Sequence, residues 1–445
     1  MKNFSDFGIR IPDILLPKNL NLETWAVIAC DQYTQDKAYW ESVEKIVGND
    51  RSTLNLILPE QKLSEETKDE QLKKIEQTMN EYCTDNFFAS PKNAFVYVER
   101  TSAFGRKRCG LIACLDLEQY EWKSGKTSLV RATEKTIYER ALARKAIRES
   151  ASLDLSHIML LVNDPEFLLI EKIGKLIEKS IDEKKEKIEK AYSGSLMKNG
   201  GNILAYFVPS SMHSMMINAL EKISRQNKQE DGSVFLFAAG DGNHSLAAAK
   251  AVWDEAKNTL SESEKLNSPL RYALVEIVNL YSTGLKVYPI HRAFFNIDAN
   301  AFVAAFATKF AVSEKNFLTF EELKDCTRTS SCFGFIYQNP KEHGNFCYKC
   351  VFIKNSNLEI VLFQDFADNY ISEHKNISLD FIHGKEEVHR LCKEKNALGI
   401  IMPNVDMSRF FKTISTCGSL PRKSFSLGKA DEKRFYLETR KLRKH

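Results

Sequence analysis

The sequence predicts a mixed α/β fold in two units, and three observations lead to that prediction. Short apolar segments typical of buried strands alternate with helical segments along the whole chain. A length of 445 residues exceeds what one small core requires. After Phe295 the pattern changes to shorter, regularly alternating elements. We therefore expect a larger N-terminal region over 1–290 and a smaller α/β unit over 291–445.

The N-terminal region is expected to supply a largely buried sheet. Apolar segments closed by polar loops predict its strands, at 25–30, 94–99, 109–115, 158–162, 234–239 and 272–279. Gly105 lies between the second and third of these, which predicts a hairpin. Helical periodicity or charge patterning predicts helices at 37–47, 63–87, 171–191 and 245–260.

The second unit is expected to alternate helices and strands. The predicted helices cover 299–310 and 321–326, and the predicted strands cover 332–337, 348–353, 359–362 and 398–402. The tail from 420 to 445 is basic and polar, so it can fold back over the first unit. Its basic groups Arg422-Lys423-Ser424 and Lys433-Arg434 could form a lid that neutralises phosphate, although such charge runs usually lie on solvated surface.

Composition excludes several classes of protein. The 63 basic and 59 acidic residues give a formal net charge of +4, which offers no reason to expect nucleic-acid or membrane binding. We find no secretory signal and no apolar run long enough to span a bilayer, and the ten scattered cysteines suit reduced thiols in the cytoplasm. The single C-x-x-C, Cys347 to Cys350, lies in a predicted strand. Without a second ligand pair it is a weak zinc signal, and we expect two structural cysteines.

The most informative motif is the loop Gly240-Asp241-Gly242-Asn243-His244-Ser245, between a buried strand and an alanine-rich helix. The two glycines permit backbone angles closed to other residues, and free N–H groups at a helix start form an anion site. His244 and Ser245 add hydrogen-bonding groups, and Asp241 suits a metal ion or an orienting role. The alternative is an ordinary capped helix after a glycine turn.

This loop and several other blocks resemble a known family. Residues 241–250 look like the D-G-[NH]-H-[RS]-x-x-[AT]-A signature of a large family of bacterial, archaeal and some protist proteins long labelled as of unknown function. The signature is similar to the phosphate-binding box of the ParB-like clan, which includes ParB nucleotide switches, sulfiredoxin and free-serine kinases. Further blocks that resemble the family lie at 25–34, 56–60, 131–134, 157–161, 289–292 and 420–425.

Within that family the chain looks most like pyrophosphate-dependent kinases of free L-serine. The resemblance implies a ParB/sulfiredoxin-like phosphate-binding core and a phosphotransferase that makes O-phospho-L-serine, a step linked to amino-acid and cysteine biosynthesis. Many relatives carry a second histidine before the conserved one and a basic or hydroxyl residue after it. Asn243 and Ser245 stand at those places here. Because an Arg, which would suit a larger nucleotide phosphate array, is absent, we expect a small donor, pyrophosphate, rather than a nucleotide.

Two other segments carry candidate substrate-binding groups. Asp31, Gln32 and Tyr33 follow the first buried strand, where functional side chains gather in such sheets. Asp31 could accept a proton from an attacking hydroxyl, and the resembled kinases place a carboxylate base near this strand. The residues at 131–136 provide ligands suited to an amino acid, with the Arg binding its carboxylate and the Glu its ammonium: Arg131, Thr133, Glu134 and Thr136. A helix cap is the alternative for both segments.

Basic residues late in the chain are weaker candidates for binding the donor phosphates. His291 and Arg292 follow Pro289, and Arg422 and Lys423 precede the basic tail. A lone His-Arg pair is more often structural. The segment Asp380-Phe381-Ile382-His383-Gly384 recurs in the resembled family, and we assign it no role.

The leading hypothesis from the sequence is a serine kinase. Asp31 would be the base, Asp241 would hold Mg²⁺ or orient the substrate, and His244 would offset charge in the transition state. The donor would be pyrophosphate, and the protein a monomer or homodimer without nucleic-acid or membrane partners. The alternatives are an ADP- or ATP-dependent serine kinase, a nucleotide-gated ParB-like switch without kinase activity, and a phosphatase acting at the same loop.

Overall fold

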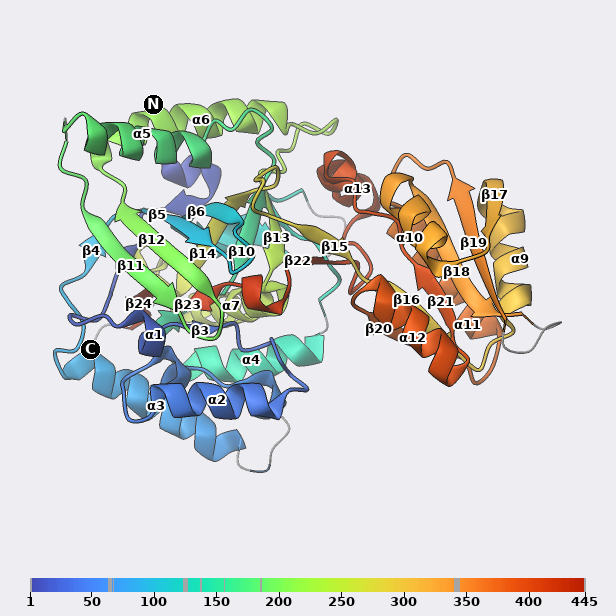
Figure 1. The fold of residues 1–445 in the computed structure, drawn as a ribbon. Helices are drawn as coiled ribbons and strands as arrows, with labels where there is room; N and C mark the ends of the chain where they lie inside the picture. The colour runs from blue at the N-terminus through green and yellow to red at the C-terminus, as the bar shows by residue number, and fades with distance from the viewer. Residues whose placement is uncertain are drawn as a thin grey trace. The chain divides into compact units, whose positions relative to one another are not determined.

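The computed structural model forms two units (Figure 1). It describes residues 2–62, 66, 68–122, 127–136, 138–155, 157–184, 186–339 and 345–443, with the backbone alone for 138–140, 142 and 143. Unit 1 comprises Met1–Lys286 and Leu427–His445, and unit 2 comprises Val287–Ser426. None of the described helices is long and apolar enough to cross a membrane.

Unit 1 is built on a ten-stranded mixed sheet. Its strand order is β11-β12-β5-β6-β14-β10-β13-β8-β7, with β1 also paired to β6. The pairs β10–β14, β13–β8 and β7–β8 are parallel and the others are antiparallel. The strands are β1 (Ile9–Arg10), β5 (Val96–Thr101), β6 (Lys107–Asp116), β7 (Tyr120–Glu121), β8 (Val130–Ala132), β10 (Met159–Val162), β11 (Lys190–Leu196), β12 (Gly201–Phe207), β13 (Phe237–Asp241) and β14 (Tyr272–Asn279). The predicted α/β class is confirmed.

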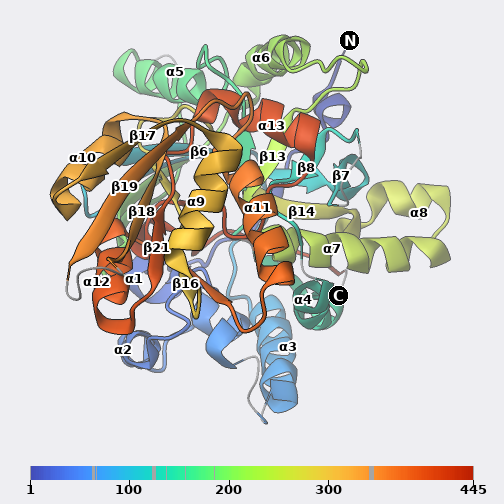
Figure 2. The ribbon, with the colours of Figure 1, turned by 90° about the vertical axis from the view of Figure 1, so that its right-hand side faces the viewer.

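Helices cover both faces of this sheet because its strands carry apolar residues on both sides. Tyr97 and Leu111 face a core shared with α5 (Ile170–Asp182) and α6 (His213–Gln226). Their neighbours Val98 and Ile112 face the opposite core, which contains residues of α1 (Leu22–Trp25), α2 (Lys37–Val47) and α3 (Lys68–Thr84). Figures 1 and 2 show α5 and α6 on one side of the sheet and α2 and α3 on the other.

Short strand pairs attach the ends of the chain to unit 1. β23 (Phe435–Tyr436) pairs with β3 (Val27–Ile28), and β24 (Thr439–Lys441) pairs with β9 (Leu153–Leu155). β2 (Asp13–Ile14) pairs with β4 (Lys92–Asn93). The predicted division at 290/291 therefore needs a correction. Residues 427–443 belong to unit 1, because Phe435, Tyr436 and Leu437 fill its core.

Three further helices of unit 1 lie between its strands in the sequence: α4 (Tyr138–Ser150), α7 (Asn243–Ala256) and α8 (Glu262–Asn267). α7 follows β13 after a single residue, Gly242, and it packs along α4. Leu246, Ala249 and Trp253 of α7 join the same core as α5 and α6. The helix is thus fixed against the sheet immediately after its first turn.

Unit 2 has a six-stranded antiparallel sheet in the order β17-β19-β18-β21-β16-β20. Its strands are β16 (His291–Phe295), β17 (Ala311–Phe317), β18 (Cys332–Gln338), β19 (Phe346–Ile353), β20 (Ser378–Ile382) and β21 (Leu398–Ile401), and a separate pair joins β15 (Val287–Pro289) to β22 (Phe425–Leu427). Its helices are α9 (Ala299–Phe310), α10 (Phe320–Thr329), α11 (Glu359–Glu373), α12 (Lys385–Lys395) and α13 (Phe410–Cys417). Phenylalanines of α9 and α11 pack on one face of the sheet, and α10 and α12 cover the other.

Most predicted elements match observed ones, and the errors have physical causes. The predictions for α2, α9 and β14 reproduce their bounds. The predicted strand at 359–362 is wrong, because α11 starts at Glu359. The buried residues Ile360, Phe363 and Ala367 repeat with helical spacing beyond the short window that suggested a strand. The predicted helix at 171–191 ends at Asp182, before β11.

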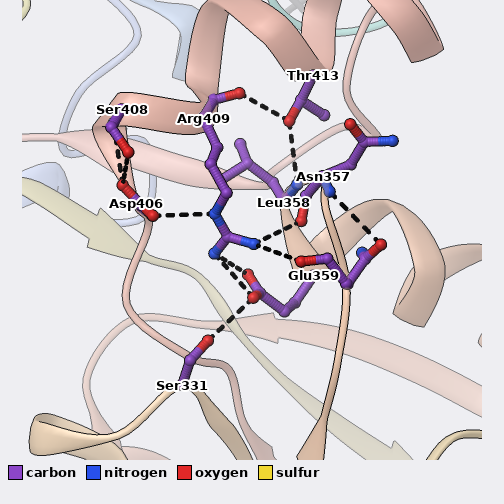
Figure 3. Close-up of polar contacts among 9 residues, drawn as sticks. Ser331, Asn357, Leu358, Glu359, Asp406, Ser408, Arg409 and Thr413 are labelled. Carbon is purple, nitrogen blue, oxygen red and sulfur yellow. Dashed lines mark hydrogen bonds and ion pairs between the residues drawn. The ribbon is translucent and has the colours of Figure 1, made fainter.

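An ion-pair network fixes the start of α11 in unit 2 (Figure 3). The Arg409 guanidinium donates to both oxygens of Glu359 at 2.8 and 3.0 Å and to Asp406 at 2.9 Å. It also donates to the carbonyl oxygen of Asn357 at 2.8 Å. Glu359 is buried, so this guanidinium neutralises a carboxylate that has little access to water.

Candidate functional site

The turn between β13 and α7 has the geometry expected of an anion-binding loop. Gly242 has φ +73° and caps the helix, and glycine has no side chain to occupy the first-turn N–H groups. Side chains of the turn stabilise it. Asp241 Oδ1 accepts a hydrogen bond from Gly242 N at 3.0 Å. Asn243 Oδ1 accepts from Thr133 N, and Asn243 Nδ2 donates to Thr133 Oγ1, both at 3.3 Å. Thr133 Oγ1 donates to Ala239 O at 2.6 Å.

A close backbone approach brings this turn to His157. A Cβ atom at Gly242 would lie 3.0 Å from Ile158 Cα and 3.5 Å from His157 Cδ2, so a side chain there would collide with the segment leading into β10. The register between β10 and β13 shifts beside Met159, the partner of Asp241. Such bulges are frequent next to functional sites, where they re-aim side chains.

Asp31, in the N-terminal segment of the chain, faces the same histidine. Its Oδ2 lies 3.7 Å from His157 Nε2, and its Oδ1 accepts from Gln32 Nε2 at 2.9 Å. Burial alone would raise the pKa of the Asp31 carboxyl, but His157, Arg144 and the Gln32 hydrogen bond together lower it. Asp31 is therefore an ionised carboxylate at neutral pH.

His157 is neutral and belongs to a buried chain of polar groups. Burial lowers the pKa of its imidazole, despite the opposing effects of Asp31 and Asp241. Its Nδ1 lies 2.7 Å from the Tyr436 hydroxyl, which lies 3.1 Å from Cys30 Sγ. Burial raises the pKa of the Cys30 thiol to about 11, so the thiol keeps its proton. The tautomer that directs Nε2–H at the Asp31 carboxylate is electrostatically favoured.

The C-terminal segment contributes a cation at the turn. Lys433 Nζ donates to Asp241 Oδ2 at 3.0 Å, and both side chains are largely buried. Buried arginines fix this segment: Arg100 donates to the carbonyl oxygens of residues 431–433, and Arg434 pairs with Glu276 at 3.1 Å. The position of the Lys433 ammonium is thus set by a rigid backbone rather than by a mobile tail.

A cavity of about 100 Å³ opens beside His157, Tyr436 and Cys30. Its apolar wall comes from residues of η2 (Thr53–Leu56), α3, α4 and β9: Leu56, Met79, Ile147, Leu153 and Leu155. Its polar wall contains His157, Ser245 and Tyr436, together with the ion pair between Arg144 and Glu60 at 3.0 Å. The cavity therefore offers charged groups of both signs and a hydrophobic surface to a small molecule.

The arrangement can perform acid–base chemistry next to a bound anion. Asp31 is an ionised proton acceptor, the α7 N-terminus attracts negative charge, and Lys433 provides a fixed positive charge. His157 lies between Asp31 and the turn and connects the two parts. A hydroxyl in this space could lose its proton to Asp31 while an electrophile is held at the turn.

The structure brings together part of the predicted site. Asp31 and Gln32 lie in this cluster with the loop residues Asp241, Gly242, Asn243 and Ser245, and Thr133 positions that loop. His244 is half-buried in the first turn of α7, and Gly240 lies against Leu161 and Leu427, where a side chain would collide.

Other predicted residues have different surroundings. Arg131 donates to Ser128 O and Ser233 Oγ and lies over the Phe235 ring, so its guanidinium is directed to these neighbours. Tyr33 stacks on Tyr39 at 3.7 Å. Glu134 is half-buried, and the Thr136 hydroxyl is buried without a hydrogen-bond partner among the described residues.

The four basic residues predicted to bind donor phosphates belong to unit 2. Arg292 is fully buried and donates to Gln364, to Ile290 O and to Lys423 O, so we assign it a structural role in that unit. His291 Nδ1 accepts from Met402 N at 3.1 Å. Arg422 and Lys423 are exposed beside the Phe381 ring.

Sequence reasoning missed five contributors: Cys30, Glu60, Arg144, His157 and Tyr436. Glu60 and His157 lie in blocks that carry the family resemblance, and that position was the available signal. Cys30 and Tyr436 are paired only through the β3–β23 contact, which joins opposite ends of the chain. Arg144 lies in a charged helix whose pattern resembles any solvated helix.

The fold and site define an α/β protein in which a glycine turn at a helix N-terminus and the Asp31 carboxylate lie beside His157, a residue that lines a cavity. The chain belongs to the family described as "Protein of unknown function (DUF1015)", which matches residues 13–378. No curated protein matches it. The solved structures that match include a free serine kinase in complex with AMP. Its sequence is 11% identical, the TM-score is 0.36, and the alignment covers 74% of this chain and 92% of the kinase chain. A conserved hypothetical protein from Pyrococcus furiosus is 10% identical with a TM-score of 0.35, covering 74% and 94%. Such weak likeness transfers neither ligand nor activity.

Proposed function

We propose that this protein is a small-molecule phosphotransferase that phosphorylates the hydroxyl of free L-serine, with pyrophosphate as the donor. The observation that carries the proposal is the placement of an ionised carboxylate, Asp31, and of the turn at Gly242 beside the same histidine, His157. A base and an anion site on either side of one histidine suit transfer of a phosphoryl group to an alcohol.

In the proposed reaction the serine hydroxyl oxygen attacks phosphorus while its proton passes to Asp31. A new P–O bond forms to serine, the bridging P–O bond of pyrophosphate breaks, and orthophosphate leaves with the electron pair. The N–H groups at the start of α7 and the Lys433 ammonium stabilise the negative charge on the donor. His244 and Ser245, in the first turn, are the nearest side chains of the helix for the same task.

The cavity supports a small acceptor. Its volume of about 100 Å³ is of the same order as the roughly 150 Å³ of a cavity that accepts benzene, so it suits a molecule about as small as a single amino acid. Arg144 and Glu60 can exchange their mutual ion pair for the carboxylate and ammonium of an amino acid. We assign to this pair the substrate-gripping role that the sequence suggested for Arg131 and Glu134.

We propose that Mg²⁺ accompanies the donor. Asp241 is the candidate ligand, but one of its oxygens accepts from Gly242 N and the other pairs with Lys433. Mg²⁺ commonly takes one or two carboxylates together with substrate phosphates, so the donor would complete its coordination. When bound, Mg²⁺ would neutralise charge on the transferring phosphate.

All ten cysteines are free thiols, which suits the cytoplasmic location that we propose.

The test is a product assay by mass spectrometry on the purified full-length chain. Serine, Mg²⁺ and pyrophosphate should yield phosphoserine and orthophosphate. Turnover only with ADP or ATP would refute pyrophosphate as donor, and turnover with none of them would refute the kinase. Release of orthophosphate without phosphoserine would indicate a hydrolase.

A pair of matched variants tests the base. Asp31→Asn keeps the shape of the side chain and removes its charge, so kcat should fall by roughly 10²–10⁴-fold, the usual contribution of a general base. Asp36→Asn is the control, because Asp36 caps α2 through Tyr39 N and asparagine caps equally well. An Asp31→Asn variant with wild-type kcat would remove Asp31 from the mechanism.

A further inference from the structure

Three cysteine side chains converge in unit 2, in the core beneath α10 and α12. Cys332 Sγ lies 3.4 Å from Cys350 Sγ and 3.9 Å from Cys326 Sγ, and all three sulfur atoms lie within 4.8 Å of one another. Cys332 and Cys350 are fully buried on β18 and β19, whereas Cys326, on α10, is partly exposed. Among the described residues, no other group of three or more His, Cys, Asp or Glu side chains converges in this way.

The strand register argues against a disulfide between the two buried cysteines. Cys332 stands opposite Phe352, and Cys350 stands opposite Gly334, so the two cysteines are diagonal neighbours across the antiparallel pair. Diagonal positions lie about 7–8 Å apart, near or beyond the roughly 7 Å limit for Cα atoms joined by a disulfide. The side chains lean toward each other without backbone positions that suit a bond.

We infer that Cys326, Cys332 and Cys350 form a binding site for a thiophilic metal ion, with Zn²⁺ as the cation that the geometry suits best. Three converging sulfur ligands favour a soft or borderline cation over Mg²⁺ or Ca²⁺. This site belongs to unit 2 and does not depend on the proposed kinase activity.

The sulfur spacing is close to what tetrahedral zinc requires. Zn–S bonds of about 2.3 Å place tetrahedral sulfur ligands about 3.8 Å apart, between the two shorter distances observed. Shifts of a few tenths of an ångström in flexible side chains would complete the arrangement. Three cysteines leave a fourth position for water, and the partly exposed Cys326 provides an entry path from solvent.

Charge and proton balance are also satisfied. Binding releases one proton from each thiol, so three thiolates and Zn²⁺ carry a net charge of −1. Lys385 lies close enough to interact electrostatically with Cys332. Its ammonium is held by Thr327 Oγ1 at 2.9 Å and by Lys324 O at 3.3 Å. This cation offsets the remaining charge in a partly buried position.

The C-x-x-C motif in the sequence contributes only one of these ligands. Cys347 and Cys350 are three residues apart on β19, so their side chains point to opposite faces of the strand. Cys350 meets Cys326 and Cys332 through the packing of α10 on the sheet. On this inference Cys350 would be a metal ligand, and Cys347 alone would keep the structural role that the sequence predicted.

The experiment is a Zn²⁺ titration of the reduced full-length chain, under anaerobic conditions, in competition with a chromophoric chelator. Cys326→Ser is the test variant, because its partly exposed position tolerates a hydroxyl. Cys347→Ser, on the same sheet, and Cys392→Ala, in the same core, are the matched controls. Circular dichroism confirms that each variant is folded. A Co²⁺ titration then reports thiolate ligation through its sulfur-to-metal charge-transfer absorption.

We expect wild type and both controls to bind one more Zn²⁺ per chain than Cys326→Ser. Affinity should fall by more than about 100-fold in that variant, since loss of a residue that merely supports a ligand already costs roughly 10–100-fold. Equal stoichiometry and affinity in Cys326→Ser and Cys347→Ser would overturn the inference. So would the absence of thiolate charge-transfer bands in the wild-type protein, or a Cys332–Cys350 disulfide in the freshly purified chain.

Discussion

Gly242→Ala tests both the left-handed backbone of the turn and its close approach to Ile158. Gly242 has φ +73°, and an L-residue in the left-handed region costs about 1–2 kcal/mol. The added Cβ would lie 3.0 Å from Ile158 Cα, inside the roughly 3.5–4.0 Å optimum for carbon atoms, and overpacking of this kind costs about 1–3 kcal/mol. Alanine recovers about 0.4–1 kcal/mol by restricting the unfolded chain. The expected net loss of unfolding free energy is therefore about 1–5 kcal/mol.

Gly105→Ala separates strain from collision. Gly105 has φ +72° in the hairpin loop of the same unit, and a Cβ there would meet nothing within 4 Å. It should therefore lose only about 1 kcal/mol. Urea unfolding of both variants measures the difference, and the product assay measures activity. If Gly242→Ala were no less stable than Gly105→Ala, the close approach of the turn to Ile158 would be refuted. If it kept full activity, the turn would not be the donor site.

Three further predictions concern other buried contacts. Burial, with the nearby charges of Lys385, Arg292 and His383, lowers the pKa of His291 to about 3, so the folded protein keeps it neutral while the unfolded chain protonates it below about 6.5. The free energy of unfolding should therefore fall as the pH decreases below that value, by up to about 1.4 kcal/mol per pH unit. His291→Asn should reduce this pH dependence, measured by urea unfolding at pH 5 and 7. An unchanged pH dependence would contradict the assignment. Arg409→Ala should lower the free energy of unfolding by about 3–5 kcal/mol, because it leaves the buried Glu359 carboxylate without its counter-charge. Lys412→Ala, at an exposed position, should have almost no effect. Equal losses in the two variants would exclude the ion pair as the cause. Tyr436→Phe removes the hydroxyl partner of His157 Nδ1 and should cost about 1–3 kcal/mol, and a variant as stable as wild type would show that the hydrogen bond contributes nothing.

Local sequence patterns were sufficient for most elements and for the class of fold. Strand β14 and helices α2 and α9 have strong periodicity, and their bounds were predicted without error. The start of α11 was assigned to a strand because a window of four residues cannot distinguish a buried strand from a buried helix. Residues 427–443 were assigned to the wrong unit, because nothing local indicates that β23 pairs with β3.

The candidate site was predictable where its residues are neighbours in the chain. The turn from Gly240 to Ser245 is contiguous, and Asp31 follows an apolar segment, so both gave signals. Arg144 and Tyr436 enter the site through helix packing and long-range pairing, which no short motif encodes. Arg131 illustrates the opposite error, because a chemically suitable residue type was given a role although its partners are local backbone and serine groups.

The position of residues 427–443 within unit 1 has a consequence for synthesis of the chain. Unit 2 is inserted between the two parts of unit 1, so 140 residues (287–426) must be translated before Lys433 and Tyr436 exist. At about 5–20 residues per second, this delay lasts roughly 7–28 s. During that interval the nascent first unit lacks the strand that pairs with β3 and the aromatic residues that fill its core. Unit 1, the proposed catalytic unit, therefore cannot complete its folding until unit 2 has been synthesised.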